Sequence, residues 1–415
     1  MSSERNIIVV GASFAGVSAA HYVLKHVLPS LPKEGKYRLV LINPATHMFH
    51  VMAVPRLVAS PELLPPSKAF NSIEDGFKQY GKDRFSFIQA KATNLNTAER
   101  TLTFQTASGA EDRLPYHALI LASGTRTSAP YLSSQTNPHE ETKKALSDIN
   151  SQIKKAKTII IGGGGPAGVE TAGEIGEAMN GTAGWFASRP SKQKVEITVI
   201  TGAERLLPVL RPASAQQAET YLNRVGVDVV YNTRITSAST QADGKTKVIL
   251  SNGKEMEADV YIPATGTIPN SEFVPKQFLD EKAFVITNVQ MRVDKASSLY
   301  AVGDVASYGR GGILDMFEAV PVLGTNLKRD LLASDAGQQP TGGDRSHKPL
   351  TAEGQLVPIG RSKGVGAFNG NKLPSMMVWA IKGRDYMLGQ SPEIISGKKW
   401  TKEKSWKPTD AQPVM

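Results

Sequence analysis

The chain has 415 residues and a formal net charge of +10, and this length is enough for two or three domains with hydrophobic cores of their own. It contains no cysteine, which excludes disulfide bonds, thiolate metal sites and a redox-active C-x-x-C motif. The seven histidines show no zinc-ligand spacing, so we expect no metal site. No targeting signal precedes the first predicted strand and no stretch is typical of a transmembrane helix, so we expect a cytoplasmic protein.

The first predicted unit is "NIIVVGASFAGVSAAHYVL", residues 6–24, which runs from a strand through a turn into a helix. Gly11 and Gly16 occupy the outer positions of a G-x-G-x-x-G dinucleotide-binding motif, and Ser13 replaces its middle glycine. The next predicted strand ends at Asn43, where this fold usually places an acidic residue that binds a ribose hydroxyl. This unit therefore departs from the motif at two positions.

The second predicted unit is "TIIIGGGGPAGVETAGEI", residues 158–175, and it repeats the same order of strand, turn and helix. Here Gly163, Gly165 and Gly168 complete the motif, and the free N–H groups of the following helix favour a phosphate. Glu170 follows directly, just inside the helix. A glycine-rich turn of an ordinary α/β protein is the alternative.

Three further strands are predicted to end in small residues or a carboxylate. "HALILASGT" and "ADVYIPATGT" end in turns that contain Gly124 and Gly266. "SLYAVGDVAS" places Asp304 directly after a strand and a glycine, where a doubly wound sheet binds a ligand hydroxyl. An Asp that caps a turn is the alternative for this position.

Taken in chain order, the motifs "GASFAG", "LASG", "GGGGPAGVE", "PATGTIPN" and "YAVGD" resemble a known family. They are similar to the flavoproteins with two dinucleotide-binding domains, which include the pyridine nucleotide-disulfide oxidoreductases. "LLP" and "PATGTIPN" look most like the apoptosis-inducing-factor-like branch, which includes the ferroptosis-suppressor type. The resemblance covers about residues 5–330 and is weak beyond them.

This resemblance implies that the first site binds FAD and the second binds NAD(P)H. The residues that it implies for FAD are Gly11, Ser13, Gly16, Asn43, Arg56, Ala92, Gly124 and Asp304. Those that it implies for NAD(P)H are Gly163, Gly165, Gly168, Glu170, Arg205 and Gly266. Arg56 beside the flavin ring and Glu170 at the nicotinamide end are the expected catalytic residues. A helix that begins near residues 319–327 is expected to stabilise charge on the reduced flavin.

The strand in "VEITVITGAERLLP" ends at Ile200 and Thr201 without a carboxylate for the ribose 2′-OH, and Arg205 follows. This favours NADPH or use of both nucleotides, with a surface role for Arg205 as the alternative.

Because no sulfur can relay electrons, the acceptor is expected to meet the flavin directly. A quinone is the economical acceptor, and oxygen, a dye, a small carrier or a pathway-specific metabolite are alternatives. The net positive charge leaves a further alternative, a redox-sensing basic binding protein. No motif predicts a specific nucleic-acid partner.

The predicted fold is α/β, with an NAD(P)H-binding domain, residues 155–266, inserted in an FAD-binding domain, residues 1–128 and 267–330. A small C-terminal α+β domain, residues 346–415, is expected to cover the flavin or to form a homodimer. Two insertions, "KHVLPSLPKEGKYR" and "MNGTAGWFASRPSKQK", lengthen helix-to-strand connections without a purpose that the pattern reveals.

The C-terminal region combines aromatic and basic residues. Trp400 and Trp406 alternate with lysines, and residues 373–388 carry Trp379 and Tyr386 beside a basic turn. Such a composition favours a peripheral contact with an anionic membrane. A tail whose tryptophans pack on the body of the protein is the alternative.

Overall fold

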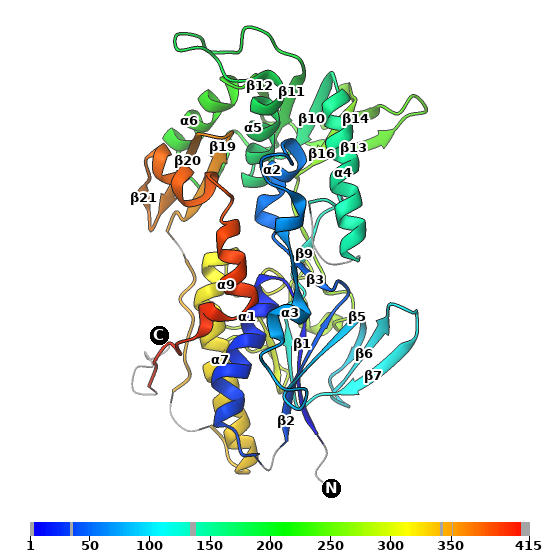
Figure 1. Cartoon of the computed structure of the whole chain (residues 1–415), viewed down its shortest axis with the longest axis vertical. Coiled ribbons are helices and arrows are strands. Elements are labelled where there is room, and N and C mark those ends of the chain that lie inside the picture. The colour runs from blue at the N-terminus through cyan, green and yellow to red at the C-terminus, as the bar shows by residue number, and fades with distance from the viewer. Residues whose placement is uncertain (1–3, 34–35, 133–137, 341–342, 351, 408–415) are drawn as a thin grey trace.

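The computed structural model describes residues 4–33, 36–132, 138–340, 343–350 and 352–407. The molecule is elongated, with a first α/β lobe at the lower end of Figure 1 and a second at the upper end. Each lobe contains a parallel sheet, and a small α+β unit follows them in the chain. The predicted fold class is therefore confirmed.

The first lobe is built on a seven-stranded sheet in the order β18-β8-β1-β2-β5-β6-β7. The five strands from β18 to β5 pair in parallel, and β6 and β7 continue as an antiparallel meander. The strands are β1 (Arg5–Val10), β2 (Tyr37–Asn43), β5 (Phe85–Asn96), β6 (Thr101–Thr106), β7 (Glu111–Pro115), β8 (Ala118–Leu121) and β18 (Leu299–Ala301). Helices α1 (Phe14–Tyr22) and α7 (Ile313–Asp335) pack against each other on this sheet.

The second lobe has a four-stranded parallel sheet in the order β12-β11-β10-β16. Its strands are β10 (Thr158–Gly162), β11 (Glu196–Ile200), β12 (Val227–Val230) and β16 (Val260–Pro263). Its helices are α4 (His139–Lys155), α5 (Pro166–Asn180) and α6 (Pro212–Asn223). An antiparallel sheet is added by β13 (Ile235–Thr240), β14 (Thr246–Leu250) and β15 (Glu255–Ala258).

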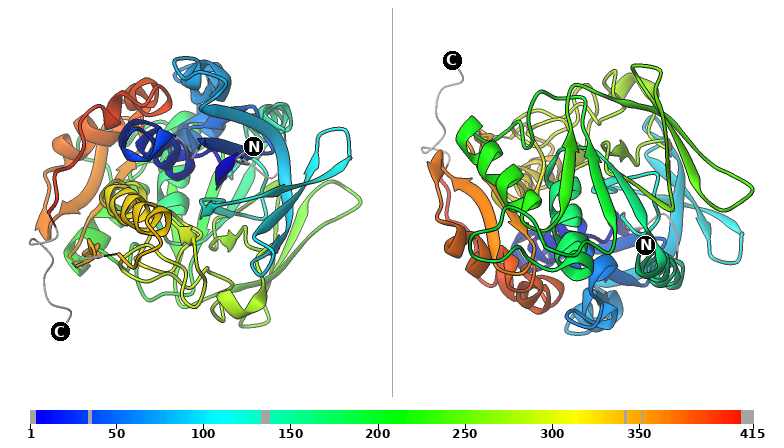
Figure 2. Two further views of the ribbon diagram at one scale, coloured as in Figure 1. Left: turned by 90° about the horizontal axis from the view of Figure 1, so that it is seen from below. Right: turned by 90° about the horizontal axis from the view of Figure 1, so that it is seen from above.

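The chain crosses between the lobes twice, and the two crossings pair with each other. The outgoing strand β9 (Thr125–Arg126) lies antiparallel to the returning strand β17 (Ile268–Pro269). Strand β18 then joins the first sheet beside β8. The second lobe is thus inserted in the chain of the first, and Figure 2 shows both lobes end-on.

Short elements between β2 and β5 connect the lobes further. These are β3 (His47–Phe49), α2 (Val54–Ala59), β4 (Phe70–Ser72) and α3 (Ile73–Phe77). Helix α2 belongs to the first lobe by sequence but packs against α4 and α5 of the second lobe. Its buried Leu57 accordingly lies in the same hydrophobic cluster as Ile161 and Val169.

The C-terminal unit covers the side of both lobes. It contains β19 (Gln355–Ile359), β20 (Lys363–Phe368), β21 (Asn371–Lys372), α8 (Ser375–Val378), the π-helical turn η7 (Trp379–Gly383) and α9 (Ser391–Ile395). Strand β19 packs on α5, and α9 packs on α1. This unit therefore bridges the two nucleotide-binding lobes.

Two expectations about the C-terminal half need correction. The helix expected to begin near residues 319–327 begins at Ile313, so those residues lie inside α7. The tryptophan expected to meet a membrane, Trp400, is only 3% exposed and packs edge-on against Tyr22 and Phe317. Tyr386 is fully buried as well. These rings contribute to the protein core, where burial of an aromatic side chain is most favourable.

In the described part of the chain, no helix combines the length and apolarity needed to cross a bilayer. The same residues contain no cluster of three or more acidic or histidine side chains placed to hold a metal ion. The sequence predicts polar linkers at residues 133–157 and 333–345, of which residues 133–137 and 341–342 lie outside the described residues.

Candidate active site

The two glycine motifs form the same turn in both lobes. Gly11 has φ +103°, and a Cβ built on it would lie 2.3 Å from the carbonyl oxygen of Ala122. Gly163 has φ +118°, and its Cβ would lie 2.1 Å from the carbonyl oxygen of Ala264. Only glycine fits either position, since any side chain would clash with the neighbouring strand.

The last glycine of each motif brings the helix against the turn. A Cβ on Gly16 would lie 1.7 Å from the Gly11 carbonyl oxygen, and one on Gly168 would lie 2.0 Å from that of Gly163. The role that the motif predicts for these glycines, close packing of helix and strand, is thus satisfied in both lobes. Repetition of this geometry supports two separate dinucleotide sites.

The middle position differs between the motifs. A Cβ on Gly165 would meet no atom within 4 Å, because this residue faces open space at the start of α5. That space is where a pyrophosphate would approach the helix N-terminus. Ser13 holds the corresponding place before α1 and lines a cavity of about 250 Å³.

Two cavities of the first lobe are lined in part by the residues that were expected to bind FAD. A cavity of about 420 Å³ is lined by Gly11, Asn43 and Ala92, among others. The neighbouring cavity of about 250 Å³ is lined by Gly124 and Asp304. Neighbouring residues line the two cavities, so an elongated dinucleotide fits along the edge of the sheet.

Asn43 is buried, and its side-chain amide is already engaged. Its Oδ1 accepts from the Ala12 backbone N–H at 2.9 Å, and its Nδ2 donates to the Ala45 carbonyl at 2.7 Å. These bonds fix the turn that follows β1. We therefore assign Asn43 a supporting role for the FAD cavity, beside any contact to a ribose.

Asp304 lies at the carboxyl end of β18 and is exposed to the cavity. Its Oδ1 accepts from the Gly312 backbone N–H at 2.9 Å, directly before α7. Gly312 and Ile313 line the same cavity, so the N-terminus of α7 faces it. The expected contribution of a helix dipole thus comes from the residues around Ile313.

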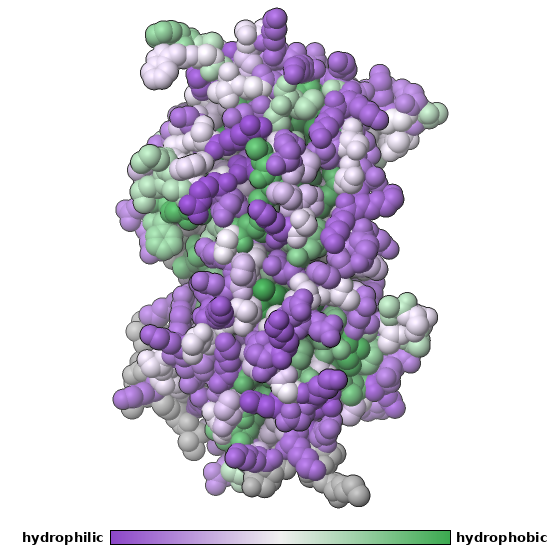
Figure 3. Space-filling model, viewed as in Figure 1, coloured by the Kyte–Doolittle hydropathy of each residue, from purple (hydrophilic) through white to green (hydrophobic). Residues whose placement is uncertain are grey.

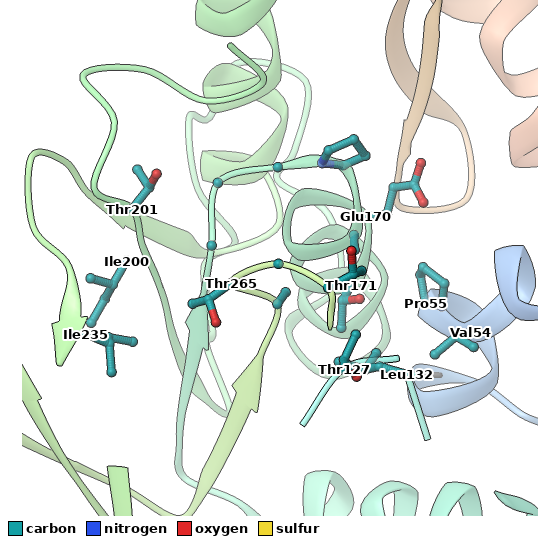
Figure 4. Close-up of a pocket in the computed structure, with 18 of the residues that line it drawn as sticks. Val54, Pro55, Thr127, Leu132, Glu170, Thr171, Ile200, Thr201, Ile235 and Thr265 are labelled. Carbon is teal, nitrogen blue, oxygen red and sulfur yellow. The ribbon is translucent and has the colours of Figure 1, made fainter. Parts of the chain in front are cut away.

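The second lobe has a cavity of about 830 Å³, which is larger than the two cavities of the first lobe (Figure 4). It is lined by the glycine motif of α5, the ends of β11 and β16, helix α2 of the first lobe and Lys382 of the C-terminal unit. Gly163, Gly165, Glu170 and Gly266 all line it. Gly168 lies beneath, where it packs helix against turn.

Glu170 projects from α5 toward the C-terminal unit in Figure 4. Its Oε1 lies 2.5 Å from the Nζ of Lys382, which also donates to the Leu356 carbonyl at 3.2 Å. Burial raises the pKa of the Glu170 carboxyl to about 7, although the ammonium of Lys382 opposes this shift. The pKa of this carboxyl group therefore lies near neutral pH, above the ordinary range of a glutamate.

Lys382 was not among the residues expected in the site. It stands in "VWAIKGRDYML", where its charge was interpreted as part of a basic surface. In the structure the turn η7 packs on β19 and brings Lys382 to the cavity wall. Its partner Glu170 lies 212 residues earlier in the chain, a separation that no local pattern shows.

Arg56 does not line the cavities, although it was expected beside the flavin ring. Its guanidinium binds Glu174 through two hydrogen bonds of 2.7 and 3.0 Å and donates to the Arg384 carbonyl at 2.9 Å. It also lies over the ring of Tyr386, whose hydroxyl donates to Glu174 at 3.0 Å. The structure thus gives Arg56 a bridging role between α2, α5 and the C-terminal unit.

Arg205 also lies away from the lining of the large cavity. Its guanidinium donates to the Pro208 carbonyl at 3.2 Å, which is the surface role that was the alternative. Arg234 lines the cavity instead, close to Thr201 and Gly202 at the end of β11. Arg234 is therefore the better candidate for a contact with a ribose 2′-phosphate.

The comparisons agree with this geometry. The family model described as "Pyridine nucleotide-disulphide oxidoreductase" matches residues 5–322. "Oxidoreductase phnG" of Penicillium herquei is 42% identical over 411 residues, which cover 97% of this chain and 98% of that one. "Ferroptosis suppressor protein 1" of Xenopus tropicalis is 26% identical over 396 residues, with 93% and 94% covered.

A solved structure has the same fold. The NAD-dependent persulfide reductase from A. fulgidus matches with a TM-score of 0.66 at 21% identity, covering 87% of this chain and 63% of that one. The residues of the two cradles fit the cofactors of this family, FAD in the first lobe and NAD(P)H in the second. Its similarity to the ferroptosis suppressor proteins extends over almost the whole length of both chains. This chain belongs to the pyridine nucleotide-disulphide oxidoreductase family.

Proposed function

We propose that this chain is an FAD-dependent NAD(P)H oxidoreductase that passes electrons directly to a small planar acceptor of the quinone type. One observation carries the proposal. Five residues line both the FAD cavity beside Asp304 and the large cavity of the second lobe: Val51, Met52, Thr127, Leu132 and Thr267. A nicotinamide ring and a flavin ring would therefore meet across this shared wall.

Bound FAD supplies the redox chemistry, since it takes a hydride from NAD(P)H and delivers electrons to an acceptor. The chain supplies no thiol, so the acceptor must itself reach the shared wall. Val51, Met52 and Leu132 in this wall, with Val54 and Pro55 of α2 beside them, are apolar. Such a lining excludes water and favours a flat, apolar ring.

Quinone reduction needs a proton, and Glu170, held by Lys382, is its proposed donor. Reduction of a quinone to a quinol consumes one proton from solvent in addition to the hydride that NAD(P)H provides. Burial raises the pKa of Glu170 to about 7, which suits a carboxyl group that donates a proton at neutral pH. The adjacent Lys382 donates a hydrogen bond to Glu170 Oε1 and so holds the carboxyl group at the cavity wall.

An acceptor screen under anaerobic conditions tests this proposal. The holoprotein is mixed with NADH or NADPH, the loss of flavin absorbance is followed, and quinones, dyes and small carrier proteins are then added. We expect both nucleotides to reduce the flavin and quinones to reoxidise it faster than dyes of equal potential. Flavin that NAD(P)H reduces but that no quinone reoxidises would exclude the quinone and favour a pathway-specific metabolite. If neither nucleotide reduces the flavin, the proposed oxidoreductase activity is excluded and a redox-sensing binding protein is favoured.

A further inference from the structure

The loop that joins α5 to β11, residues 181–194, presents two adjacent aromatic side chains to solvent. We call it the aromatic loop. Trp185 is 89% exposed and Phe186 is 99% exposed, and the loop projects at the upper end of the molecule in Figure 1. Single exposed apolar side chains are ordinary on protein surfaces. Two neighbouring, almost fully exposed rings are less ordinary, and we call Trp185 and Phe186 together the apolar tip of the loop.

The base of the loop is anchored by Arg224, which follows α6. Its guanidinium donates to the carbonyl of Ala187 at 2.8 Å and to those of Ala183 and Gly184 at 2.9 and 3.1 Å. The Ala183 N–H in turn donates to the Arg224 carbonyl at 2.7 Å. These bonds fix the backbone on both sides of the two rings.

The returning half of the loop is anchored separately. Arg189 forms an ion pair with Asp228 after α6. The Oδ1 of Asn180 accepts from the backbone N–H groups of Lys194 and Val195 at 2.8 and 3.1 Å. The exposure of Trp185 and Phe186 is therefore a property of an ordered loop, held outward by its own framework.

The surroundings of the rings are basic. Residues 181–194 contain Arg189, Lys192 and Lys194 and no acidic residue. Lys192 and Lys194 are exposed, and among the residues that the structure describes neither forms an ion pair. Their charge is therefore available to an anionic surface.

The apolar area of the tip distinguishes between two binding partners, a second copy of the chain and a lipid bilayer. A Trp and a Phe together bury about 300–500 Å², whereas each partner of a stable protein–protein interface buries about 800 Å². A bilayer needs far less, because a few aromatic side chains in the headgroup region and nearby lysines suffice for peripheral binding. The tip is thus too small to hold a second copy of the chain but large enough to insert into lipid.

We propose that the aromatic loop binds the surface of an anionic lipid bilayer, with Trp185 and Phe186 inserted at the headgroup level and Lys192 and Lys194 beside lipid phosphates or carboxylates. The site lies apart from the nucleotide cavities. Helix α5 begins at the large cavity and ends at Asn180 after 15 residues, a rise of about 22 Å. Binding to a bilayer therefore leaves the cavity open.

Vesicle sedimentation with the full-length holoprotein tests the proposal. Vesicles of phosphatidylcholine are compared with vesicles that also contain phosphatidylserine, at low salt. We expect the protein to sediment with the anionic vesicles, and Trp185→Ala/Phe186→Ala to lower the partition coefficient roughly ten-fold or more, equivalent to about 1.4 kcal/mol. Lys192→Glu/Lys194→Glu is expected to abolish the preference for anionic lipid.

The matched control changes exposed apolar residues elsewhere. Met376→Ala/Trp379→Ala alters side chains of the C-terminal unit that are 73% and 36% exposed, and it should leave vesicle binding unchanged. A blue shift of tryptophan emission on vesicle addition should disappear in Trp185→Phe and persist in Trp379→Phe. The loop variants should retain FAD and dye reduction, since the loop is remote from the cavities.

Three results would overturn the proposal. One is full-length protein that stays in the supernatant with anionic vesicles at low salt. Another is equal loss of binding in the loop variant and the Met376/Trp379 control, which would locate the contact in the C-terminal unit. The third is a dimer, seen by sedimentation velocity without lipid, that Trp185→Ala/Phe186→Ala dissociates, because the tip would then serve a contact between two copies.

Discussion

Replacing Arg56 with methionine separates a structural role from a catalytic one. The side chains of Arg56 and Glu174 are only 6% and 1% exposed, and two hydrogen bonds join them. Methionine keeps the length and apolar volume of the side chain but leaves the Glu174 carboxylate buried without its cation. Removal of one partner of a buried ion pair typically costs about 3–5 kcal/mol. We expect a decrease of this size in the free energy of unfolding of Arg56→Met.

A second substitution should restore part of this loss. Glu174→Gln removes the orphaned charge and keeps an oxygen that accepts from the Tyr386 hydroxyl, which lies 3.0 Å from Oε1. Arg56→Met/Glu174→Gln is therefore expected to be more stable than Arg56→Met alone. Arg205→Ala, with a single hydrogen bond to Pro208, should change stability by less than about 0.5 kcal/mol and serves as the control.

Urea unfolding of the holoproteins measures these differences. The midpoint and the slope are analysed together, because a changed slope would show that the compactness of a state has changed. Flavin reduction by NAD(P)H is measured in parallel and should stay within a factor of a few in folded Arg56→Met. A loss of stability below about 1 kcal/mol, or loss of flavin reduction without loss of stability, would refute the structural role.

Three further predictions concern the large cavity. Gly165→Val places a side chain in the open space at the start of α5, so it should slow flavin reduction by NAD(P)H without loss of FAD. An unchanged rate of reduction would show that the nucleotide does not bind in this cavity. Arg234→Ala should weaken NADPH more than NADH, whereas Arg205→Ala should affect neither; equal effects of Arg234→Ala on both nucleotides would exclude a 2′-phosphate contact. Burial raises the pKa of Glu170 to about 7, so the rate of quinone reduction should fall as the pH rises through about 7, because the protonated form is then lost. If Glu170→Gln has the same pH profile, Glu170 is not the proton donor.

The backbone of both nucleotide sites could be predicted from the sequence, because it depends on local rules. Gly11 and Gly163 must be glycine for reasons that lie within one turn of chain, and a buried strand precedes each of them. The same is true of Asp304 at the end of β18. Patterns that depend only on residues close together in the sequence therefore predict the folded backbone correctly here.

The start of α7 was predicted too late because its first turn carries no strong start signal. Gly312 precedes it without a capping side chain, and Pro321 lies inside the helix. A proline is typical of a first helical turn, so Pro321 gives no local sign that a helix already runs through it. The surrounding buried residues, among them Val320 and Leu323, keep the helix continuous there.

The partners of Arg56 and Trp400 depend on contacts between distant segments. Arg56 stands on α2, which by sequence follows the first glycine motif, yet α2 packs against the second lobe. Trp400 lies among lysines and looked like a membrane residue, but Tyr22 and Phe317 provide an aromatic pocket for it. The composition of a segment is compatible with several environments, whereas its tertiary neighbours determine which of its side chains are buried.

One part of the site was within reach of physical reasoning on the sequence. Helix α5 carries Glu170 and Glu174 one turn apart, on a stretch that is otherwise small or apolar and that the strand–turn–helix motif buries. Two buried carboxylates need cations or hydrogen-bond donors, because an unpaired buried charge is very costly. The chain therefore had to bring basic or hydroxyl groups to α5 from elsewhere, and it brings Lys382 to Glu170 and Arg56 with Tyr386 to Glu174.

The difference in pairing has a chemical consequence. Glu174 is held by a bidentate guanidinium inside the core, whereas Glu170 faces the cavity with a single ammonium and a pKa of about 7. Under the proposed function, Glu170 is therefore the carboxyl group expected to give a proton to the acceptor.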